Sequence, residues 1–209
     1  MRVGTAAKRA LVVGGIHAGS EANTAALVQQ LLERAVERPL DERMAVTFLP
    51  VANPDGLANG TRLLASRVDL NRNWPTRDWA PDTYEAGPYA PVALPGGGGP
   101  YPLSEPEAWA LADFVLRLRP GLIVSYHSAA RLVMAGPAAR ALNWDLTYAE
   151  MAGYPLGDWT AYPVTGDFAQ WAEDQAIPTI EVELPDHIST DLEANDQALR
   201  ALVRAFAAG

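Results

Sequence analysis

The chain has 209 residues, 49% of them hydrophobic, and its 16 Lys and Arg against 25 Asp and Glu give a formal net charge of −9. A chain of this length can bury a substantial core in one domain. The acidic balance, without any basic block, argues against nucleic acid and anionic membranes as partners. Because cysteine is absent, thiolate metal sites and cysteine nucleophiles are excluded, and a metal must bind to histidine and carboxylate side chains.

The N-terminal segment carries a few basic residues before a short apolar stretch, which makes a poor signal peptide. No stretch approaches the roughly 20 apolar residues that a membrane-spanning helix needs. We therefore expect a cytoplasmic protein, with export as the alternative if residues precede Met1.

The first quarter of the chain predicts a strand, a helix and a second strand. Residues 10–16 are apolar, β-branched and interrupted by glycine, which is typical of a buried strand. Ser20 precedes apolar residues at helical spacing over 25–36, which predicts a helix capped by this serine. Residues 44–52 predict the second strand, and Asn-Pro-Asp-Gly at 53–56 predicts a turn that reverses the chain.

The rest of the chain continues to alternate. Residues 75–103 are rich in proline and glycine and predict a long surface loop. Ser104 and Glu107 have the spacing of a capping box, which predicts a helix over 105–118. The remaining expected strands are 121–126, 131–135 and 178–184, and the remaining helices are 138–152, 167–176 and one from about 189.

This order of elements predicts an α/β fold, with a mixed and mostly parallel sheet and helices on both faces. In such sheets, ligands bind where the strands end at their carboxyl edge. His17, His127 and Glu183 all lie at or near the ends of predicted strands. The carboxyl edge of the sheet is therefore the expected functional site.

Two of the three histidines, His17 and His127, follow predicted buried strands. Taken singly, each fits an ordinary loop histidine, and Glu21 fits a solvated carboxylate in the first turn of a helix. Together, two histidines and a glutamate with one open position form a catalytic zinc arrangement. Such a metal lowers the pKa of bound water to roughly 7 and makes hydroxide available at neutral pH.

Segment 67–74, Arg-Val-Asp-Leu-Asn-Arg-Asn-Trp, crowds arginines and asparagines behind an apolar pair. It is either an exposed polar turn or an anion-binding site, because unpaired buried charge is costly. An arginine fork beside an asparagine amide suits a carboxylate, which it can bind through two hydrogen bonds. The segment therefore predicts a carboxylate-binding site.

A series of motifs resembles the zinc carboxypeptidase family, peptidase family M14. In order, they are HAGSE, NPDG, GTR, VDLNRNW, SEPE, SYHS, YPVTGDFAQW and EVEL, and they span residues 9 to about 187. The sequence is most similar to the short bacterial branch with murein-peptide amidases and other γ-D-glutamyl-diaminopimelate peptidases. The resemblance implies one catalytic domain over residues 1–209, with the family's first strands missing from it or lying upstream.

The resemblance also implies the catalytic residues. The metal ligands would be His17, Glu21 and His127, holding one Zn²⁺ per chain. The general base would be Glu183, within EVEL. The arginine that polarises the oxyanion would be Arg62, with Arg67 as the alternative.

The substrate-binding residues follow in the same way. Asn71 and Arg72 would bind the terminal carboxylate of the substrate, and Tyr162 would be the mobile tyrosine that covers it. Asp69 would orient His17, since metal-bound histidines generally need a partner on the other ring nitrogen.

The spacing of the first two ligands departs from the usual pattern of the family. Most members have His-x-x-Glu, whereas His17 and Glu21 are separated by three residues. Gly19 can adopt a loop conformation closed to other residues, and some members with motifs resembling HGGYE have the same insertion. We therefore expect both side chains to reach the same metal.

Several other residues have two interpretations. His187 is either a fourth ligand or, as we favour, a loop histidine, and Asp167 either pairs with a cationic side chain or begins a helix. Trp74, Phe168 and Trp171 are expected to pack around the site. The sequence lacks a Gly-x-Ser-x-Gly elbow, and the glycines at 96–99 precede neither lysine nor a helix, which argues against serine hydrolases and phosphate-binding loops.

The expected function is a zinc metallocarboxypeptidase that removes the C-terminal residue of a peptide with a free carboxylate, a murein-type peptide included. One alternative is a zinc-dependent N-acyl amino acid deacylase resembling aspartoacylase and succinylglutamate desuccinylase. Another is a non-catalytic carboxylate-binding protein on the same fold. The NPDG and NRNW motifs and Tyr162 favour the peptidase. We expect a monomer, and whether the cleaved bond is an α-peptide or a γ-D-glutamyl bond is open.

Overall fold

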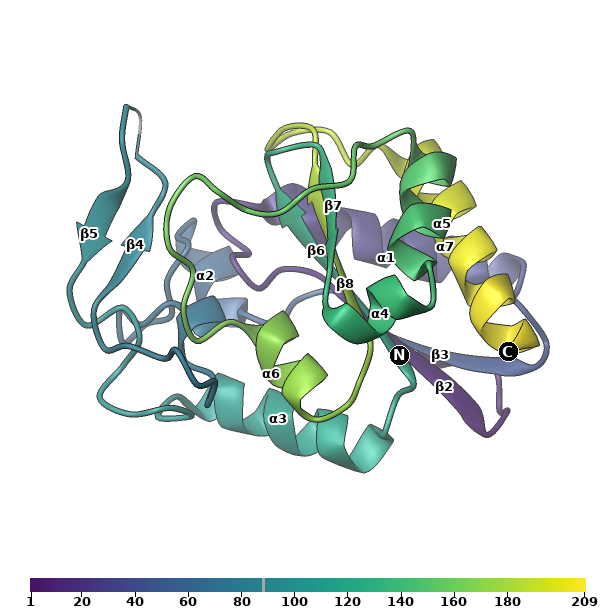
Figure 1. Ribbon diagram of the computed structural model, residues 1–209, viewed down its shortest axis with the longest axis horizontal. Coiled ribbons are helices and arrows are strands. Elements are labelled where there is room, and N and C mark those ends of the chain that lie inside the picture. The colour runs from purple at the N-terminus through teal and green to yellow at the C-terminus, as the bar shows by residue number, and fades with distance from the viewer. Residues whose placement is uncertain (88) are drawn as a thin grey trace.

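The structure is a computed structural model that describes residues 1–87 and 89–209. Its main sheet has six strands: β1 (Arg2–Val3), β3 (Met44–Leu49), β2 (Lys8–Val13), β6 (Leu122–Ser128), β8 (Thr179–Leu184) and β7 (Leu132–Ala135), in that spatial order (Figure 1). The four central strands are mutually parallel, and β1 and β7 run antiparallel at the two edges. The predicted mixed, mostly parallel sheet is confirmed.

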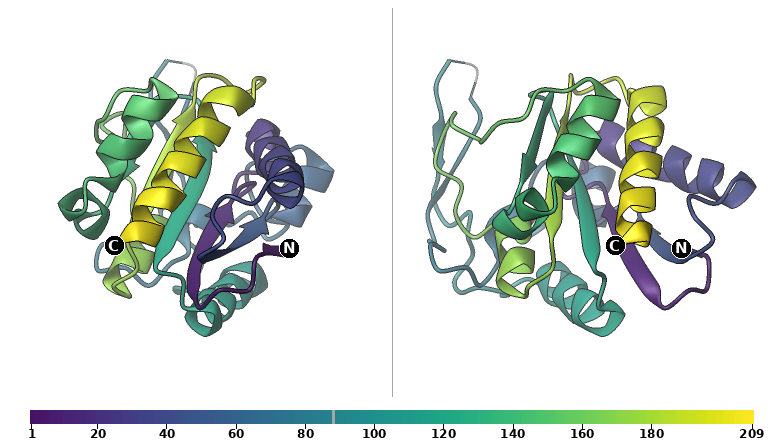
Figure 2. Two further views of the ribbon diagram at one scale, coloured as in Figure 1. Left: turned by 90° about the vertical axis from the view of Figure 1, so that its right-hand side faces the viewer. Right: turned by 45° about the vertical axis from the view of Figure 1, so that its right-hand side comes forward.

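Helices cover both faces of this sheet (Figure 2). They are α1 (Ala22–Glu37), α2 (Pro54–Asn59), the 3-10 helix η1 (Leu70–Arg72), α3 (Pro106–Leu118), α4 (Pro137–Ala141), α5 (Trp144–Ala152), α6 (Phe168–Asp174) and α7 (Leu192–Ala208). Helices α1, α5 and α7 contribute to one buried apolar cluster, and α3 and α6 contribute to the other. The α/β class expected from the sequence is therefore correct.

Strand β2 lies between the two clusters. Ala10 and Val12 belong to the cluster with α1, and Leu11 and Val13 belong to the cluster with α3. Successive side chains of a strand point to opposite faces, so a central strand covered on both sides must be apolar throughout. This explains why β2 appears in the sequence as a continuous apolar run.

The predicted cap of the first helix is wrong. Helix α1 begins at Ala22 with Glu21 at its N-cap position, and Glu21 makes no capping hydrogen bond through its side chain. Ser20 instead donates a hydrogen bond to the carbonyl of His17, at 3.3 Å. The hydroxyl of Ser20 is therefore used within the loop that holds His17. The carboxylate of Glu21 is not used as a cap and can face the histidines.

The predicted turn at residues 53–56 is the start of a helix. Asn53 caps α2 by accepting a hydrogen bond from the backbone N–H of Gly56, at 2.7 Å. Pro54 occupies the first helical turn, where its missing N–H costs nothing. The same residue types favour turns and helix starts, which explains the error.

The predicted capping box before α3 is also wrong. Helix α3 begins at Pro106 with Glu105 at the N-cap and without a side-chain capping bond. The hydroxyl of Ser104 accepts a hydrogen bond from Asn73, at 2.9 Å, and donates one to Glu105, also at 2.9 Å. These tertiary contacts replace the local cap.

Three further elements differ from the sequence predictions. The stretch expected as a plain loop contains an antiparallel hairpin of β4 (Thr83–Glu85) and β5 (Val92–Leu94), which projects at the left of Figure 1. The helix expected over 138–152 is split into α4 and α5 at Asn143, whose φ of 55° interrupts the helical path. Strand β1 was not predicted.

Within residues 1–87 and 89–209, every helix falls short of the length and apolar character of a membrane span.

Candidate functional site

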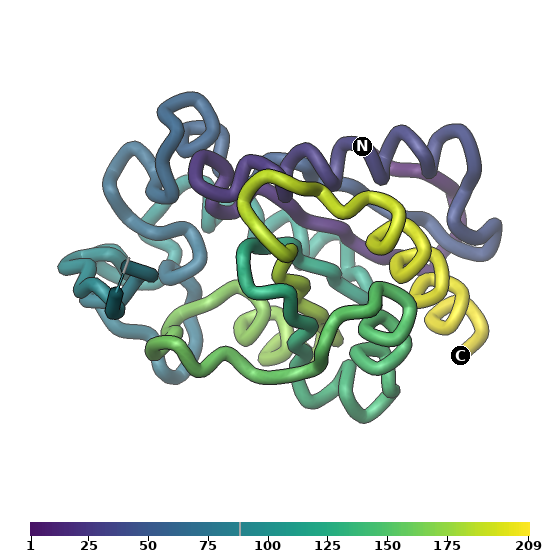
Figure 3. The backbone as a smooth tube through the Cα atoms, turned by 90° about the horizontal axis from the view of Figure 1, so that it is seen from above, coloured from purple at the N-terminus to yellow at the C-terminus, as the bar shows by residue number. Residues whose placement is uncertain are grey.

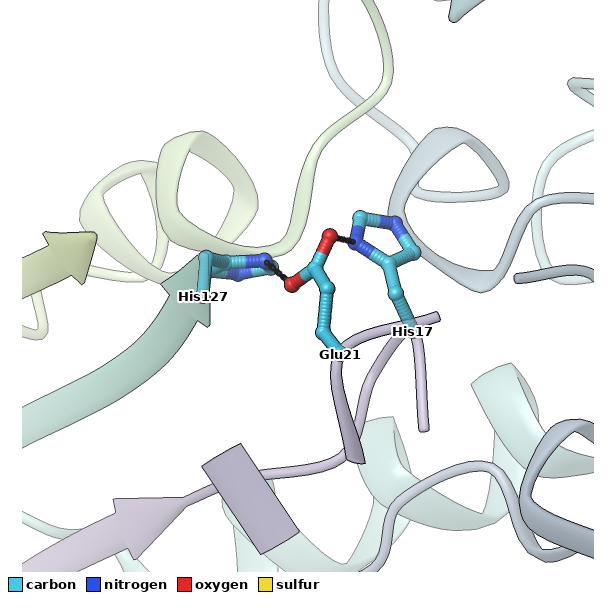
Figure 4. A group of neighbouring side chains, drawn as sticks. All are labelled: His17, Glu21 and His127. Atoms are coloured by element: carbon cyan, nitrogen blue, oxygen red, sulfur yellow. Dashed lines mark hydrogen bonds and ion pairs between the residues drawn. The ribbon is translucent and has the colours of Figure 1, made fainter. Parts of the chain in front are cut away.

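The predicted metal ligands meet at the carboxyl edge of the parallel strands (Figure 4). His17 lies in the loop after β2, which ends at Val13, and His127 is the penultimate residue of β6. Glu21 reaches between them from the start of α1. Their ligand atoms all lie within 4.8 Å of one another, and all three residues are buried.

This donor set fits a divalent transition metal. One carboxylate oxygen of Glu21 lies 2.9 Å from Nδ1 of His17, and the other lies 3.4 Å from Nδ1 of His127. Two imidazole nitrogens and a carboxylate thus point at a common centre, as in His₂Glu zinc sites that keep one position open. His187, the other candidate ligand, lies outside this group.

Asp69 fixes the orientation of His17. Its Oδ1 lies 2.9 Å from Nε2 of His17. A carboxylate oxygen accepts, so Nε2–H donates, and Nδ1 faces Glu21. The same Oδ1 accepts from the backbone N–H of Asn71, at 2.8 Å. This is the arrangement that metal-bound histidines need on the nitrogen away from the metal.

Gly19 allows the longer His-x-x-x-Glu spacing, but not for the predicted reason. Its φ is outside the left-handed region, so its backbone needs no special conformation. A Cβ at this position would lie 2.0 Å from the backbone nitrogen of Thr61 and 2.4 Å from the carbonyl of Gly56. Because the neighbouring loop approaches so closely, only glycine fits.

The charged groups of the donor set shift the pKa values of one another. Burial raises the pKa of Glu21, but the charge of His17 and the hydrogen bonds with both histidines outweigh burial and hold that pKa well below its usual range. For His127, burial lowers the pKa, yet the hydrogen bond and charge of Glu21 raise it to about 9. Without a metal, the site is therefore a carboxylate paired with a protonated imidazole.

Arg62 connects the donors to Asp69. Its Nε donates to Asp69, at 2.8 Å, and its Nη1 donates to Glu21, at 3.2 Å. The side chain is 16% exposed and lines the cleft. The predicted alternative, Arg67, is exposed and is not among the described residues that line the cleft.

A cleft of about 1020 Å³ opens over the donors, and Glu183 lies on its wall. Glu183 is 8% exposed and its Oε2 has no hydrogen-bond partner among the described residues. Burial raises the pKa of Glu183 to about 7, with Glu21 adding to the rise and His127 and Arg62 opposing it. A carboxyl group with such a pKa can both take and return a proton near neutrality.

Asn71 and Arg72 line the same cleft. Asn71 accepts a hydrogen bond from the backbone N–H of Phe168, at 3.0 Å, which anchors it to the start of α6. Arg72 is 2% exposed, donates to the carbonyl of Asn71, at 2.7 Å, and has an Nε without a partner among the described residues. A buried guanidinium with spare donors is suited to binding an anion.

Tyr162 also lines the cleft, on the segment between α5 and α6 that crosses the front of the molecule in Figure 1. Its ring makes an edge contact with Trp159, with 5.2 Å between centroids. Burial raises the pKa of Tyr162, while Arg62 and Arg72 oppose the rise. The hydroxyl is therefore a neutral hydrogen-bond donor at physiological pH.

The cleft has an acidic part that the sequence analysis recognised only through Asp167. Asp167 caps α6 by accepting from the N–H of Gln170, at 2.9 Å, as expected of a helix-terminal aspartate. Glu181 lines the cleft beside it, and burial together with the charge of Asp167 raises its pKa to about 7. Glu181 was missed, although residues 181 and 183 of one strand share a face.

The predicted packing residues form an aromatic cluster under this part of the cleft. Trp74 contacts Phe168 and Trp171, with ring centroids 4.9 and 4.8 Å apart. All three side chains are buried. Their predicted role in packing is confirmed.

Comparison with known proteins now identifies the family. Residues 3–150 match the family model described as Peptidase_M14, zinc carboxypeptidase. The chain belongs to the zinc carboxypeptidase family. Murein peptide amidase A of Vibrio campbellii is 30% identical over 187 residues, which are 88% of this chain and 72% of that protein. Murein peptide amidase A of Escherichia coli strain K12 is 33% identical over 155 residues, 72% of this chain and 61% of the relative.

Solved structures agree with this zinc carboxypeptidase assignment. Murein-tripeptide amidase from Escherichia coli O157 superimposes with a TM-score of 0.72 and 28% identity, covering 98% of this chain and 83% of that one. Bovine thrombin-activatable fibrinolysis inhibitor, in complex with tick carboxypeptidase inhibitor, superimposes with a TM-score of 0.75 and 21% identity, covering 96% and 81%. The second similarity concerns the fold alone.

Proposed function

We propose that this member of the zinc carboxypeptidase family is a zinc-dependent peptidase that releases the C-terminal residue of a murein-type peptide. The observation that supports the proposal most directly is the convergence of His17, Glu21 and His127 in one cleft with Glu183 and Arg72. The relatives named murein peptide amidase favour this branch of the family.

When bound by the three donors, zinc supplies Lewis acidity to a water molecule and to the scissile carbonyl. Glu183 accepts the proton of the attacking water, because this residue lines the cleft, its Oε2 has no partner among the described residues and its pKa of about 7 suits proton transfer at neutral pH. The same carboxyl group then returns the proton to the leaving amine.

Arg62 and the pair Asn71–Arg72 have different tasks. Arg62 aims its guanidinium into the cleft beside the donors, where it stabilises negative charge on the scissile oxygen. Arg72 and Asn71 hold the terminal carboxylate, since Arg72 is buried with unused donor capacity. Tyr162 closes over the bound peptide and donates its hydroxyl proton in a hydrogen bond.

The acidic part of the cleft favours a terminal residue with a positive group in its side chain. Asp167 and Glu181 line the same cleft as Arg72, whose charge opposes the rise in the pKa of both carboxyl groups. A side-chain amine, as in diaminopimelate, would meet these carboxylates while the terminal carboxylate meets Arg72. A neutral apolar terminal residue would offer neither acid a positive charge.

The two other functions have less support. A succinylglutamate desuccinylase/aspartoacylase from Rhodobacter sphaeroides superimposes with a TM-score of 0.65 and 20% identity, which concerns the fold alone. A non-catalytic role would require loss of the metal, yet the donor atoms of His17, Glu21 and His127 converge. A cytoplasmic location and a monomeric state stay predictions.

The test is metal analysis of the purified protein combined with hydrolysis before and after chelation. We expect about one zinc per chain, a single open metal site being typical of these peptidases, and chelator-sensitive release of diaminopimelate from a γ-D-glutamyl-diaminopimelate tripeptide. A peptide amidated at its C-terminus serves as the control and should be cleaved poorly. Equal cleavage of free and amidated peptides would contradict the role of Arg72, and failure to bind zinc would contradict the peptidase.

A further inference from the structure

The loop between β8 and α7 places His187 on the wall of the cleft. The imidazole is exposed and lines the cleft, but it is not part of the metal-donor group. The loop lies beside the start of α1, as the view from above shows (Figure 3). The proposed metal binding, proton transfer and binding of the terminal carboxylate do not use this side chain.

A chain of hydrogen bonds fixes the ring of His187. Nδ2 of Asn23 donates to the carbonyls of Asp186 and Ser189, at 2.7 and 2.8 Å, so the loop is tied to α1 on both sides of the histidine. The other amide atom, Oδ1 of Asn23, accepts from the hydroxyl of Ser128, at 3.1 Å. The only proton of that hydroxyl is therefore used.

The oxygen of Ser128 lies 2.9 Å from Nδ1 of His187. Because the serine proton points to Asn23, Ser128 must accept here, and Nδ1–H of His187 donates. This sets the ring orientation and leaves Nε2 as the free polar atom of His187. No other hydrogen bond or ion pair to the ring occurs among residues 1–87 and 89–209.

Asp186, the charged neighbour in the loop, does not satisfy Nε2. Its carboxylate accepts from the backbone N–H groups of Ile188 and Ser189, at 2.7 and 2.6 Å. Among the described residues, the arginines that line the cleft are Arg62, which is paired with two carboxylates, and Arg72, at the proposed clamp. Nε2 of His187 is thus a ring nitrogen in the cleft without a hydrogen-bonded acidic partner among the described residues.

The metal donors separate His187 from the clamp. Ser128, which holds His187, donates its backbone N–H to Glu21, at 3.1 Å, and Glu21 contacts His17. Through Asp69, His17 is connected in turn to Asn71 of the clamp. If the terminal carboxylate binds at Asn71 and Arg72 and the scissile carbonyl lies at the donors, His187 faces the acyl half of the substrate.

We propose that His187 is a specificity residue that binds a carboxylate on the acyl half of the substrate through its free Nε2. A γ-linked glutamyl residue carries a free α-carboxylate close to the scissile bond, whereas an α-linked peptide has a backbone amide there. With Nδ1–H held by Ser128, Nε2 is the ring atom left to meet that carboxylate, and a proton shared between the two makes a charge-assisted hydrogen bond. The inference rests on the proposed peptidase function and specifies the bond that it cleaves.

A binding experiment tests this without requiring turnover. The probes are the dipeptide L-alanyl-D-glutamate and its α-amide, which differ only in the carboxylate assigned to His187. Zinc-loaded wild-type protein should bind the dipeptide about tenfold more tightly than the amide, the size of a charge-assisted hydrogen bond. In His187→Gln, the ratio should fall to about one, because glutamine keeps a donor but not the charge.

Ile188→Ala is the matched control, since Ile188 is 90% exposed on the same loop, and its preference should equal that of the wild type. A wild-type protein that binds both probes equally, or a His187→Gln variant that keeps the preference, overturns the inference. In hydrolysis assays, His187→Gln should raise KM for the γ-D-glutamyl peptide while kcat stays within about twofold. The reason is that the interaction stabilises the bound substrate and the transition state equally. Absence of hydrolysis in the wild type with the binding preference intact would refute the peptidase and leave the carboxylate site.

Discussion

Among the side chains around the donors, Arg62 is held by more than one partner. Two of its nitrogens donate to Asp69 and Glu21, and among the described residues Nη2 makes no further hydrogen bond. The guanidinium is therefore fixed in direction before a substrate arrives. Preorganised donors of this kind need no reorientation when charge develops on the substrate.

Replacing Arg62 by alanine should lower kcat about 100- to 1000-fold, because loss of one donor to a developing oxyanion has an effect of that size. Steady-state hydrolysis of the murein-type tripeptide provides the measurement, with zinc content determined in parallel. Arg67→Ala is the control and should leave kcat unchanged, since Arg67 is exposed outside the cleft. Unchanged turnover in Arg62→Ala would remove this residue from the mechanism.

The protonation state of His127 predicts that zinc binding releases protons. Burial lowers the pKa of His127, but Glu21 raises it to about 9, so the metal-free imidazole is charged at pH 7. A histidine ligand must be neutral at the donor nitrogen, so metal binding displaces about one proton from His127. Calorimetric titration with zinc at pH 7 should give apparent enthalpies that vary with the ionisation enthalpy of the buffer. At pH 10, above the raised pKa, this contribution of His127 should vanish, and identical enthalpies in all buffers at pH 7 would contradict it.

The sequence predicted that His17, Glu21 and His127 lie together, but not all the reasons for their geometry. His17, Glu21 and His127 could be named because each lies in a motif next to a strand or helix end. The need for glycine at position 19 depends on the close approach of residues 56–61, which are distant in the sequence. Local sequence patterns cannot indicate such an approach. The importance of Gly19 was therefore predicted, but from its backbone conformation instead of from this close contact.

At the scale of elements, the short helix α6 connects the core to the carboxylate-binding residues. Phe168 at its start is fully buried against Trp74, and its N–H donates to Asn71. The aromatic packing thereby sets the position of the helix end that holds Asn71. Core stability and the proposed substrate clamp therefore depend on the same contacts.

Phe168→Ala should lower the free energy of unfolding by about 3–5 kcal/mol, through lost burial and the cavity left behind. Denaturant unfolding followed by tryptophan fluorescence measures this change. The matched control is Trp109→Ala on α3, whose side chain is 60% exposed and whose loss should change stability by no more than about 0.5 kcal/mol. Equal effects of the two substitutions would show that the aromatic cluster does not stabilise the fold as described.

Helix ends were the least predictable elements, for a physical reason. Ser20 and Ser104 both precede helices, as N-caps do, yet each hydroxyl bonds elsewhere. Ser20 donates to the loop carbonyl of His17, and Ser104 takes part in a contact with Asn73 from a distant segment. Propensity describes what a cap residue can do locally, and tertiary partners decide what it does. The continuous apolar runs of the central strands were predictable, because burial on both faces leaves few alternatives.

For the whole molecule, the order of strands and helices was sufficient to predict the α/β class, whereas the hairpin β4–β5 was not expected. Its strands have three residues each and lie in a stretch rich in proline and glycine. Strands of three residues are too short to show a recognisable alternation of apolar and polar residues in the sequence. The proposed metal site, by contrast, joins the loop between β2 and α1 to the end of β6.

Because the donors come from these separate elements, zinc should stabilise the folded chain as a whole. A ligand that binds only the folded state at 100 times its Kd adds about 2.7 kcal/mol, which for a chain of this size raises Tm by roughly 5 to 10 °C. Scanning calorimetry with and without zinc should show a single transition that moves upward by this amount and returns after chelation. Glu21→Gln, which removes the charged ligand, should abolish the shift. A zinc-loaded wild type with an unchanged Tm would mean that the three donors do not form a working metal site.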